Sequence, residues 1–167
     1  MPTYEKQLRG QDTISGQEGK AYITDPDTGE VILLFELKSL EAKLEKQKED
    51  IKTVGRAVNQ KKTTGWSGTG SMTLYYVTSY FRDKVMDYIN GGRDLYFTMQ
   101  VINSDPTSET YDESTGIGQK VTLTGCNLDG QVLAKIDTQS AVLEEEANFT
   151  FTGATLDQSF QKITSGL

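Results

Sequence analysis

The sequence predicts a mainly β fold: an antiparallel β-sandwich or α+β domain with one flanking α-helix. Three observations lead to this prediction. Short segments with alternating or β-branched residues recur along the chain. Glycine, proline, asparagine and aspartate separate many of these segments. Helical spacing with a signal at each end occurs convincingly only near residue 80.

The first two expected strands, 20–23 and 31–35, flank the turn-rich stretch 25–30, which is typical of a hairpin loop. The stretch also resembles a calcium-binding loop. However, Glu30 stands where such a loop needs glycine for its sharp turn, so a hairpin turn is the better interpretation.

Residues 35–54 support two interpretations. Their apolar residues fall at heptad spacing among balanced charges, which favours an amphipathic helix or a short coiled coil. Leu40, Ala42 and Leu44 also alternate with charged residues, which favours a strand less strongly. Taken alone, the pattern predicts a helix.

Residues 55–70 are expected to form an extended loop. Their glycines match neither the phosphate-binding pattern GxxxxGK[ST] nor the dinucleotide pattern GxGxxG. They therefore indicate a bend or a close approach of the backbone to a neighbour.

The one predicted α-helix follows an alternating strand at 71–77. Thr78 or Ser79 can cap its start, and the Asn90-Gly91-Gly92 sequence ends it. Its expected buried face consists of Phe81, Val85, Tyr88 and Ile89.

The remaining segments are expected to be strands and one long loop. A strand at 95–102 leads into an acidic, mobile loop at 103–118. Strands 120–128 and 131–139 should form a hairpin, because Asp129-Gly130 suits a two-residue turn. A last strand carries Phe149 and Phe151 on one face.

Composition excludes several function classes. The 167 residues include no histidine and a single cysteine, so no Ser–His or Cys–His nucleophile pair, disulfide framework or histidine-ligated metal site is expected. The sequence has no apolar stretch long enough for a membrane span and begins with a polar segment, so synthesis in the host cytoplasm is expected.

Charge is unevenly distributed. Residues 103–146 contain nine acids and two lysines, whereas residues 51–62 contain four bases and no acid. Solvated surface is the plain interpretation of such runs. The alternative is a dipolar subunit whose basic patch meets an acidic patch on a neighbour.

Short stretches along nearly the whole chain resemble the XkdM-like family of phage tail tube proteins, which is known from the Bacillus prophage PBSX and related contractile tails. Each stretch alone is weak evidence for the resemblance, but the order and spacing of all the stretches together are specific to the family. They are DTISGQEG (12–19), LEK (44–46), GR (55–56), KTTG (62–65), GTG (68–70), VTS (77–79), YFT (96–98), KVTL (120–123), LEEE (143–146) and FTF (149–151).

The resemblance implies a single domain, residues 1–167, with an N-terminal arm, and a structural subunit without enzymatic activity or cofactor. Six copies would form a ring, and rings would stack into a tube in the virion tail. The implied partners are the sheath, baseplate hub, tape-measure and tail terminator proteins, with DNA passing transiently. Residues 35–54 would be extended, as part of a hairpin that helps line the tube. We prefer this prediction to the helix that the heptad spacing favours. Residues 25–33 and 103–118 are longer than the family needs and are expected to be surface loops.

If each subunit contributes four strands to a shared β-barrel, a ring has twenty-four strands and a backbone diameter of ~45–50 Å, wide enough for duplex DNA. We expect acidic residues of 103–146 to face the lumen in part, because a basic wall would retain DNA. The basic patch would lie at ring-to-ring contacts. The candidate inter-subunit residues are Lys52, Arg56, Lys61, Lys62, Trp66, Glu144, Glu145 and Glu146.

Three alternatives remain open. The tube of a bacteriocin or secretion machine would use the same subunit. A monomeric carbohydrate-binding sandwich could use Trp66, Tyr75, Tyr76 and Tyr111 as a platform, although Tyr75 or Tyr76 is expected in the core. A glycosidase would need paired carboxylates, but the adjacent Glu144, Glu145 and Glu146 point to alternate faces of a strand.

Overall fold

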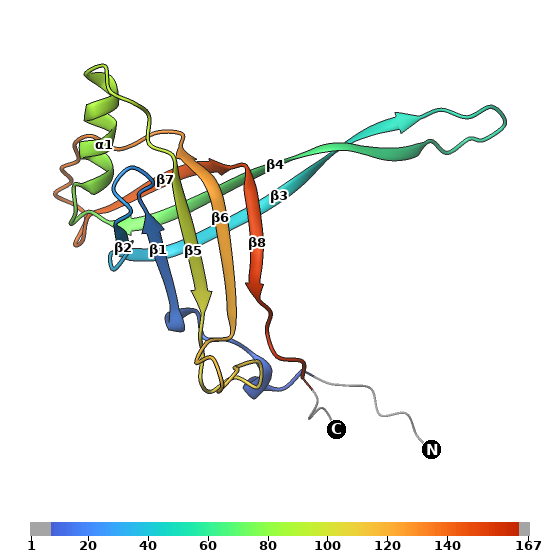
Figure 1. Ribbon diagram of the computed structural model, residues 1–167, viewed down its shortest axis with the longest axis horizontal. Helices are drawn as coiled ribbons and strands as arrows, with labels where there is room; N and C mark the ends of the chain where they lie inside the picture. Colours follow the sequence, from blue (N-terminus) through green and yellow to red (C-terminus); the bar gives the residue numbers. More distant parts are fainter. Residues whose placement is uncertain (1–7, 164–167) are drawn as a thin grey trace. The chain divides into compact units, whose positions relative to one another are not determined.

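The computed structural model describes residues 8–163 of the 167-residue chain, so residues 1–7 of the expected N-terminal arm lie outside the described residues. Within the described range the chain is mainly antiparallel β with one α-helix, as predicted (Figure 1). Hydrogen bonds connect the strands in the order β2-β1-β5-β6-β7-β4-β3, and β8 pairs with β6. The order has two free ends, so the sheet is not closed. None of the described helices is long and apolar enough to cross a membrane.

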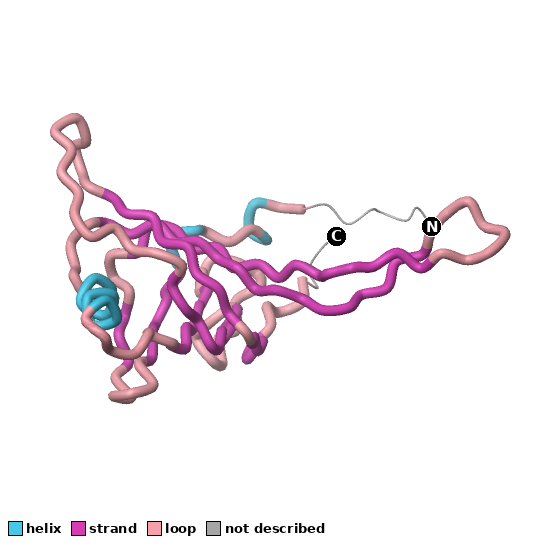
Figure 2. Tube along the Cα trace, turned by 90° about the horizontal axis from the view of Figure 1, so that it is seen from above, coloured by secondary structure: helices cyan, strands magenta, loops and turns pink. Residues whose placement is uncertain are grey.

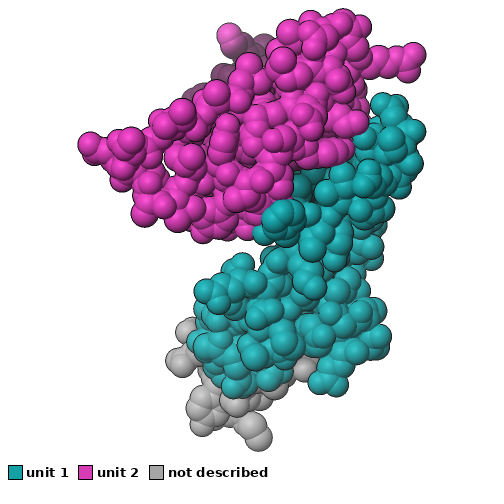
Figure 3. Space-filling model, turned by 90° about the vertical axis from the view of Figure 1, so that its left-hand side faces the viewer, with its two compact units in different colours: residues 1–35, 98–123, 154–167 teal, residues 36–97, 124–153 magenta. Residues whose placement is uncertain are grey.

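The chain divides into two compact units, which Figure 3 colours separately. The first unit comprises residues 1–35, 98–123 and 154–167. It contains β1 (Gly19–Thr24), β2 (Val31–Leu33), most of β5 (Phe97–Asn103), the first half of β6 (Gln119–Leu128) and most of β8 (Gly153–Gln158).

The first unit confirms the predicted N-terminal hairpin. Strand β1 pairs with β2 and with β5, both antiparallel, and buries Ala21 and Ile23. The Asp25 carboxylate accepts a hydrogen bond from the Asp27 N–H at 2.9 Å, and Gly29 has a φ of 70°. Asp25 therefore organises the turn, as the hairpin interpretation requires.

The acidic loop between β5 and β6 contains no strand, as predicted, but hydrogen bonds hold its first half. The Asp105 carboxylate accepts bonds from the Thr107 hydroxyl at 2.6 Å and the Ser15 N–H at 2.8 Å. These donors, the Thr107 hydroxyl foremost, lower the pKa of Asp105. The Gln11 carbonyl accepts a hydrogen bond from the Glu109 N–H, so the loop is bonded to the segment before β1.

The second unit comprises residues 36–97 and 124–153 and holds the long strands. These are β3 (Leu37–Ile51), β4 (Gln60–Tyr75) and β7 (Glu144–Phe151), with α1 (Tyr80–Ile89) and the end of β6. Strand β7 alternates buried and more exposed residues, which confirms that Phe149 and Phe151 share one buried face. Met72 and Leu74 of β4 are buried on the same face of the sheet.

The helix lies where the sequence predicts it. It follows Ser79, and Gly91 adopts a φ of 90° just beyond its end. Phe81 is buried against Phe97, with ring centroids 6.0 Å apart. Tyr88 and Ile89 are exposed, so the expected apolar face is buried only in the first turns.

Three expectations drawn from local pattern are wrong. Residues 37–51 form a strand, as the family resemblance implied, and not the helix that the heptad predicted. Residues 60–70 belong to β4 and not to a loop; the loop between β3 and β4 covers only residues 52–59. In both cases antiparallel pairing of β3 with β4 satisfies the backbone of two long segments at once and overrides local preference.

The third wrong expectation is the hairpin around Asp129-Gly130. Strand β6 ends at Leu128, and residues 131–139 form no strand. Gly130 does not adopt the positive φ that a type I′ turn requires. The Asp129 N–H instead donates to the Asn148 carbonyl on β7 at 2.8 Å. The last residues of β6 pair with β7, so the chain leaves the sheet after Leu128.

Candidate assembly surface

The most prominent feature of the second unit is the ribbon formed by β3 and β4. Its register runs from Leu37 opposite Leu74 to Ile51 opposite Gln60. Strand β7 pairs only with residues 68–75 of β4. Within residues 8–163, residues 60–67 therefore have β3 as their only neighbouring strand, and the ribbon continues as two strands beyond the end of β7 (Figure 2).

We call residues 44–51 and 60–67 the distal ribbon. Both of its edges are unpaired within the described chain, and every residue of β3 from 41 onward is exposed. Unpaired strand edges present free N–H and C=O groups to other strands. Charged side chains along β3 are a common means of keeping such an edge from pairing at random.

Two phenylalanine rings of β7 lie over one face of the neighbouring strand β4. A Cβ atom at Gly68 would overlap the ring of Phe151, and one at Gly70 would overlap Phe149. These glycines thus allow the close backbone approach that the sequence indicated. Farther along, the Trp66 ring lies 6.3 Å from that of Phe151 and is 44% exposed.

On the opposite face, residues 39–47 of β3 and the residues of β4 and β7 that lie beside them are polar or small; we call this stretch the polar face. Side chains directly opposite each other in an antiparallel pair share a face, so the strand register defines its members. It carries three carboxylates and one lysine among small hydroxyl and amide residues. The members are Ser39, Glu41, Lys43, Glu45 and Gln47 on β3, Ser67, Thr69, Ser71 and Thr73 on β4, and Glu146, Asn148 and Thr150 on β7.

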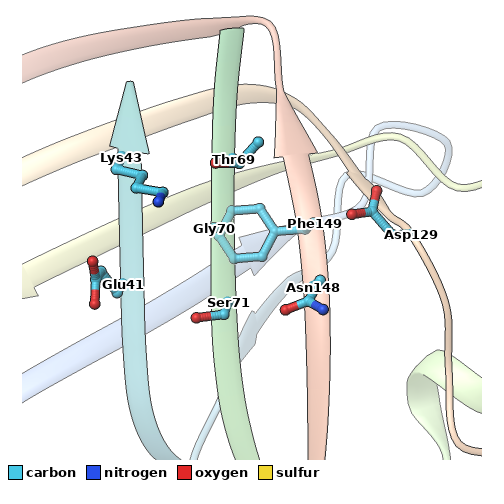
Figure 4. Close-up of a pocket in the computed structure, with 8 residues that line it drawn as sticks. All are labelled: Glu41, Lys43, Thr69, Gly70, Ser71, Asp129, Asn148 and Phe149. Carbon is cyan, nitrogen blue, oxygen red and sulfur yellow. The ribbon is translucent and has the colours of Figure 1, made fainter. Parts of the chain in front are cut away.

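An open depression of about 460 Å³ lies on this face (Figure 4). Strand β3 contributes Glu41 and Lys43, and β4 and β7 contribute hydroxyl and amide groups. Asp129 lines it from the residues just after β6. No group of three or more His, Cys, Asp or Glu side chains within residues 8–163 is placed to hold a metal ion.

A buried ion pair joins helix α1 to β7. The Arg82 guanidinium donates to the Glu145 carboxylate at 2.7 Å, and the two side chains are 12% and 4% exposed. Arg82 also donates to the Thr78 carbonyl and lies over the Tyr76 ring, 4.2 Å from its centroid. Burial raises the pKa of Glu145, and the nearby Arg82 opposes that shift. The pair fixes the helix on the sheet.

The basic residues predicted as contacts gather at the end of the ribbon. Lys52 and Arg56 lie in the 52–59 loop, and Lys61 and Lys62 begin β4; all are exposed. Lys61 makes an ion pair with Asp50 at 3.4 Å.

The three adjacent glutamates have separate roles. Glu145 is buried with Arg82, whereas Glu146 is exposed on the polar face. Glu144 is paired with Lys38 at 2.7 Å. Their alternation along β7 agrees with the sequence argument against paired catalytic carboxylates. Neither Tyr75 nor Tyr76 is buried, so the expectation that one of them is in the core is wrong.

The polar face is a feature that the sequence predictions do not include. Its signal is present, since small hydroxyl residues alternate with Trp66, Gly68, Gly70 and Met72 along β4. The prediction of a loop at 55–70 is incompatible with that alternation.

Proteins of phage tails and related injection particles share this fold. The chain superposes on the SPP1 tail tube structure with a TM-score of 0.64 at 12% identity, covering 89% of this chain and 81% of that chain. It superposes on the tube-terminating cap of the anti-feeding prophage with a TM-score of 0.66 at 8% identity, covering 95% and 100% of the two chains. At such identities the likeness shows the fold.

Sequence comparison gives the family. The phage tail tube protein family matches residues 6–157. The Phage-like element PBSX protein XkdM of Bacillus subtilis (strain 168) is 39% identical over 145 residues, covering 86% of this chain and 90% of XkdM. The chain therefore belongs to the phage tail tube protein family and is a structural component of a phage or phage-derived tail tube.

Proposed function

We propose that six copies of this chain close into a ring and that the rings stack into a tube with the polar face toward the lumen. The observation that carries the proposal is that both edges of the distal ribbon are unpaired within the described chain. Two strands without further support are at best marginally stable in water. Neighbouring copies would supply the missing strands along both open edges and bury the exposed part of Trp66.

The composition of the polar face suits a conducting wall. Glu41, Glu45 and Glu146 outnumber Lys43, and the other side chains are uncharged. Phosphates bind surfaces rich in lysine and arginine because binding releases counterions. A slightly acidic, hydroxyl-rich wall gives DNA no such anchoring and lets it pass.

The basic end of the ribbon is suited to contacts between rings. The 52–59 loop carries Lys52 and Arg56, and Val54 and Val58 are also exposed there. The chain has a net charge of −7, so a neighbouring ring offers an acidic surface to these bases. Exposed valines at a loop end gain from burial in such a contact.

The subunit's further partners would be the sheath, baseplate hub, tape-measure and tail terminator proteins of a contractile tail. Support comes from a solved sheath-tube complex of an extracellular contractile injection system. Its matching chain superposes on this one with a TM-score of 0.60 at 11% identity. This likeness also keeps open a second function, the tube of an injection particle that carries an effector in place of DNA.

Electron microscopy of the assembled protein tests the proposal. The concentrated wild-type protein should give hollow tubes with six-fold end views. A Thr150→Cys variant labelled with a small gold cluster should place the gold on the tube axis, because Thr150 is exposed on the polar face. An Arg56→Cys variant, labelled in the same way, should instead place gold at the ring boundaries.

Two results would contradict this function. A wild-type protein that stays monomeric at high concentration, even with baseplate nuclei, would favour a monomeric binding module. Gold from Thr150→Cys on the outer wall of intact tubes would overturn the orientation of the polar face.

A further inference from the structure

The segment between β6 and β7 has the β-rich sequence of a strand, but it pairs with no strand in the described part of the chain. Residues 132–134 are apolar, and Ile136 lies between the charged Lys135 and Asp137, yet residues 131–139 form no strand or helix. Leu133 is 51% exposed and Ile136 is 93% exposed. Irregular connections as long as this one, residues 129–143, are uncommon in compact domains and are often functional.

Few contacts hold this segment, and its backbone bonds lie near its two ends. The Gln131 side chain donates to Glu145 at 3.0 Å, and the Lys135 ammonium donates to the Glu144 carbonyl at 2.6 Å. The Tyr76 N–H donates to the Leu143 carbonyl at 2.9 Å. Within residues 8–163, the backbone of 132–136 makes no hydrogen bond. Its N–H and C=O groups are available to another strand.

The outer edge of β3 is an unpaired strand of matching character. Leu44 is 48% exposed on the face that carries Trp66. Lys43 and Glu45 alternate with it on the polar face, and their side chains are 60% and 65% exposed. The edge thus offers an apolar residue on one face and a base and an acid on the other.

We propose that residues 132–138 of one copy add as an antiparallel strand to the outer edge of β3 of a neighbouring copy in the ring. In the proposed register Ile136 lies opposite Leu44, Lys135 opposite Glu45 and Asp137 opposite Lys43. Both charge pairs are then opposite in sign, which favours pairing across strands. Ile136 and Leu44 cover each other on the apolar face. This inference rests on the proposed ring.

Charge and side-chain alternation disfavour the neighbouring registers. A shift of two residues in one direction places Lys135 opposite Lys43, and a shift in the other places Asp137 opposite Glu45. A shift of one residue moves Ile136 to the polar face. The proposed register is the best among these because it meets both conditions.

The occupant is a second copy because of the strand order in the chain itself. The segment leads directly into β7, and the sheet continues from β7 through β4 to β3. Two strands therefore lie between the start of β7 and the outer edge of β3. In the pairing, Lys135 exchanges its contact with the Glu144 carbonyl for the Glu45 carboxylate, a charged acceptor.

Cysteine cross-linking in assembled tubes tests the register. The variant Lys135→Cys/Glu45→Cys should form disulfides under mild oxidation and give a ladder up to the hexamer on a non-reducing gel. The matched control Lys135→Cys/Glu41→Cys places the second cysteine four residues away along β3, a shift of ~13 Å. That distance is beyond the reach of a disulfide, so the control should stay monomeric. The native Cys126 is buried and remains in both variants.

The outcomes separate this inference from the proposed function. Tubes that show no ladder, a disulfide within one chain, or a ladder in the Glu41 variant would each overturn the proposed pairing and leave the tube intact. Wild-type protein that never forms tubes under the microscope would overturn the proposed function, and the inference with it.

Proline substitution gives a second, independent readout. Leu133→Pro and Ala134→Pro, tested separately, place proline at two successive positions, so one of them removes a donor of the new ladder. At least one should reduce tube yield by tenfold or more. Both monomers should keep the wild-type circular dichroism spectrum, because this backbone makes no bonds in the free chain. Ala134→Ser is the control and should assemble normally. Full assembly of both proline variants would overturn the proposal.

Discussion

Strand β4 behaves differently in its two halves. Residues 68–75 lie between β3 and β7, and Met72 and Leu74 are fully buried there. Among the described strands, residues 60–67 pair with β3 alone, and almost all of them are exposed. The same hairpin is thus a core element at one end and an unsupported ribbon at the other. Strand pairing alone therefore does not bury a strand; a third strand and a packed face are needed.

The residues of the two halves fit these environments. The supported half places Gly68 and Gly70 under the rings of Phe151 and Phe149, where no side chain fits. The distal half carries Lys61 and Lys62, whose charged ends need solvent or a partner. In the free subunit, a mutation in the supported half should therefore lower the free energy of unfolding by much more than a mutation in the distal half.

The largest expected contrast is between two ion pairs. Arg82→Met leaves Glu145 buried without its cationic partner and should lower the free energy of unfolding at pH 7 by about 3–5 kcal/mol. Lys61→Met breaks an exposed pair in the distal ribbon and should change it by less than about 1 kcal/mol. Urea titration of the monomeric protein measures both. Equal losses would contradict the comparison.

The next contrast uses two glycines of β4. Gly70→Ala forces a methyl group into the Phe149 ring and should cost about 2 kcal/mol, or roughly 4–8 °C in Tm. Gly65→Ala in the distal ribbon meets only the Gln47 Oε1 atom, at 3.3 Å, and that side chain can move. Its Tm should stay within about 2 °C of the wild type. Calorimetry of both variants checks this; a large loss in Gly65→Ala would show that the distal half is packed in the free chain.

The smallest expected effect is the pH dependence of the Arg82→Met deficit. Burial already raises the pKa of Glu145, and removing Arg82 raises it further. A carboxyl whose pKa is higher in the folded chain stabilises the fold below its ordinary value of about 4.5, and this contribution is lost as the pH rises through the folded value. The deficit should therefore shrink toward pH 4.5, by about 1.4 kcal/mol for each further unit of pKa increase.

Denaturation at several pH values measures this change, and Lys61→Met serves as the control. A deficit of Arg82→Met that is constant from pH 7 to pH 4.5 would show that Glu145 is not the group left unpaired.

The elements predicted well are those whose signals are local and complete. The Asp25 turn, the helix between Ser79 and Gly91, and the alternation of Phe149 with Phe151 were each read from a few neighbouring residues. The heptad of 35–54 failed because Leu40 and Leu44 are spaced for both a helix and a strand. Only pairing with a segment as far away as residues 60–74 decides between them.

The candidate surface divides in the same way. The sequence located the basic residues Lys52, Arg56, Lys61 and Lys62 and the run of glutamates. It did not show that Glu145 is buried with Arg82 while Glu146 is exposed on the polar face, because that depends on which side of β7 meets the helix. The polar face could be identified only from the register of three strands.

The sequence by itself determined the antiparallel β class, the single helix, the first hairpin and the tail tube family. Tertiary structure alone decided that β3 and β4 form one long ribbon, that β7 supports only half of it, and that residues 131–139 stay unpaired. The physical reason is that local sequence sets side-chain spacing and turns, whereas a strand exists only where another strand satisfies its backbone. That partner is distant along the chain, and for residues 132–138 we propose that it belongs to another copy.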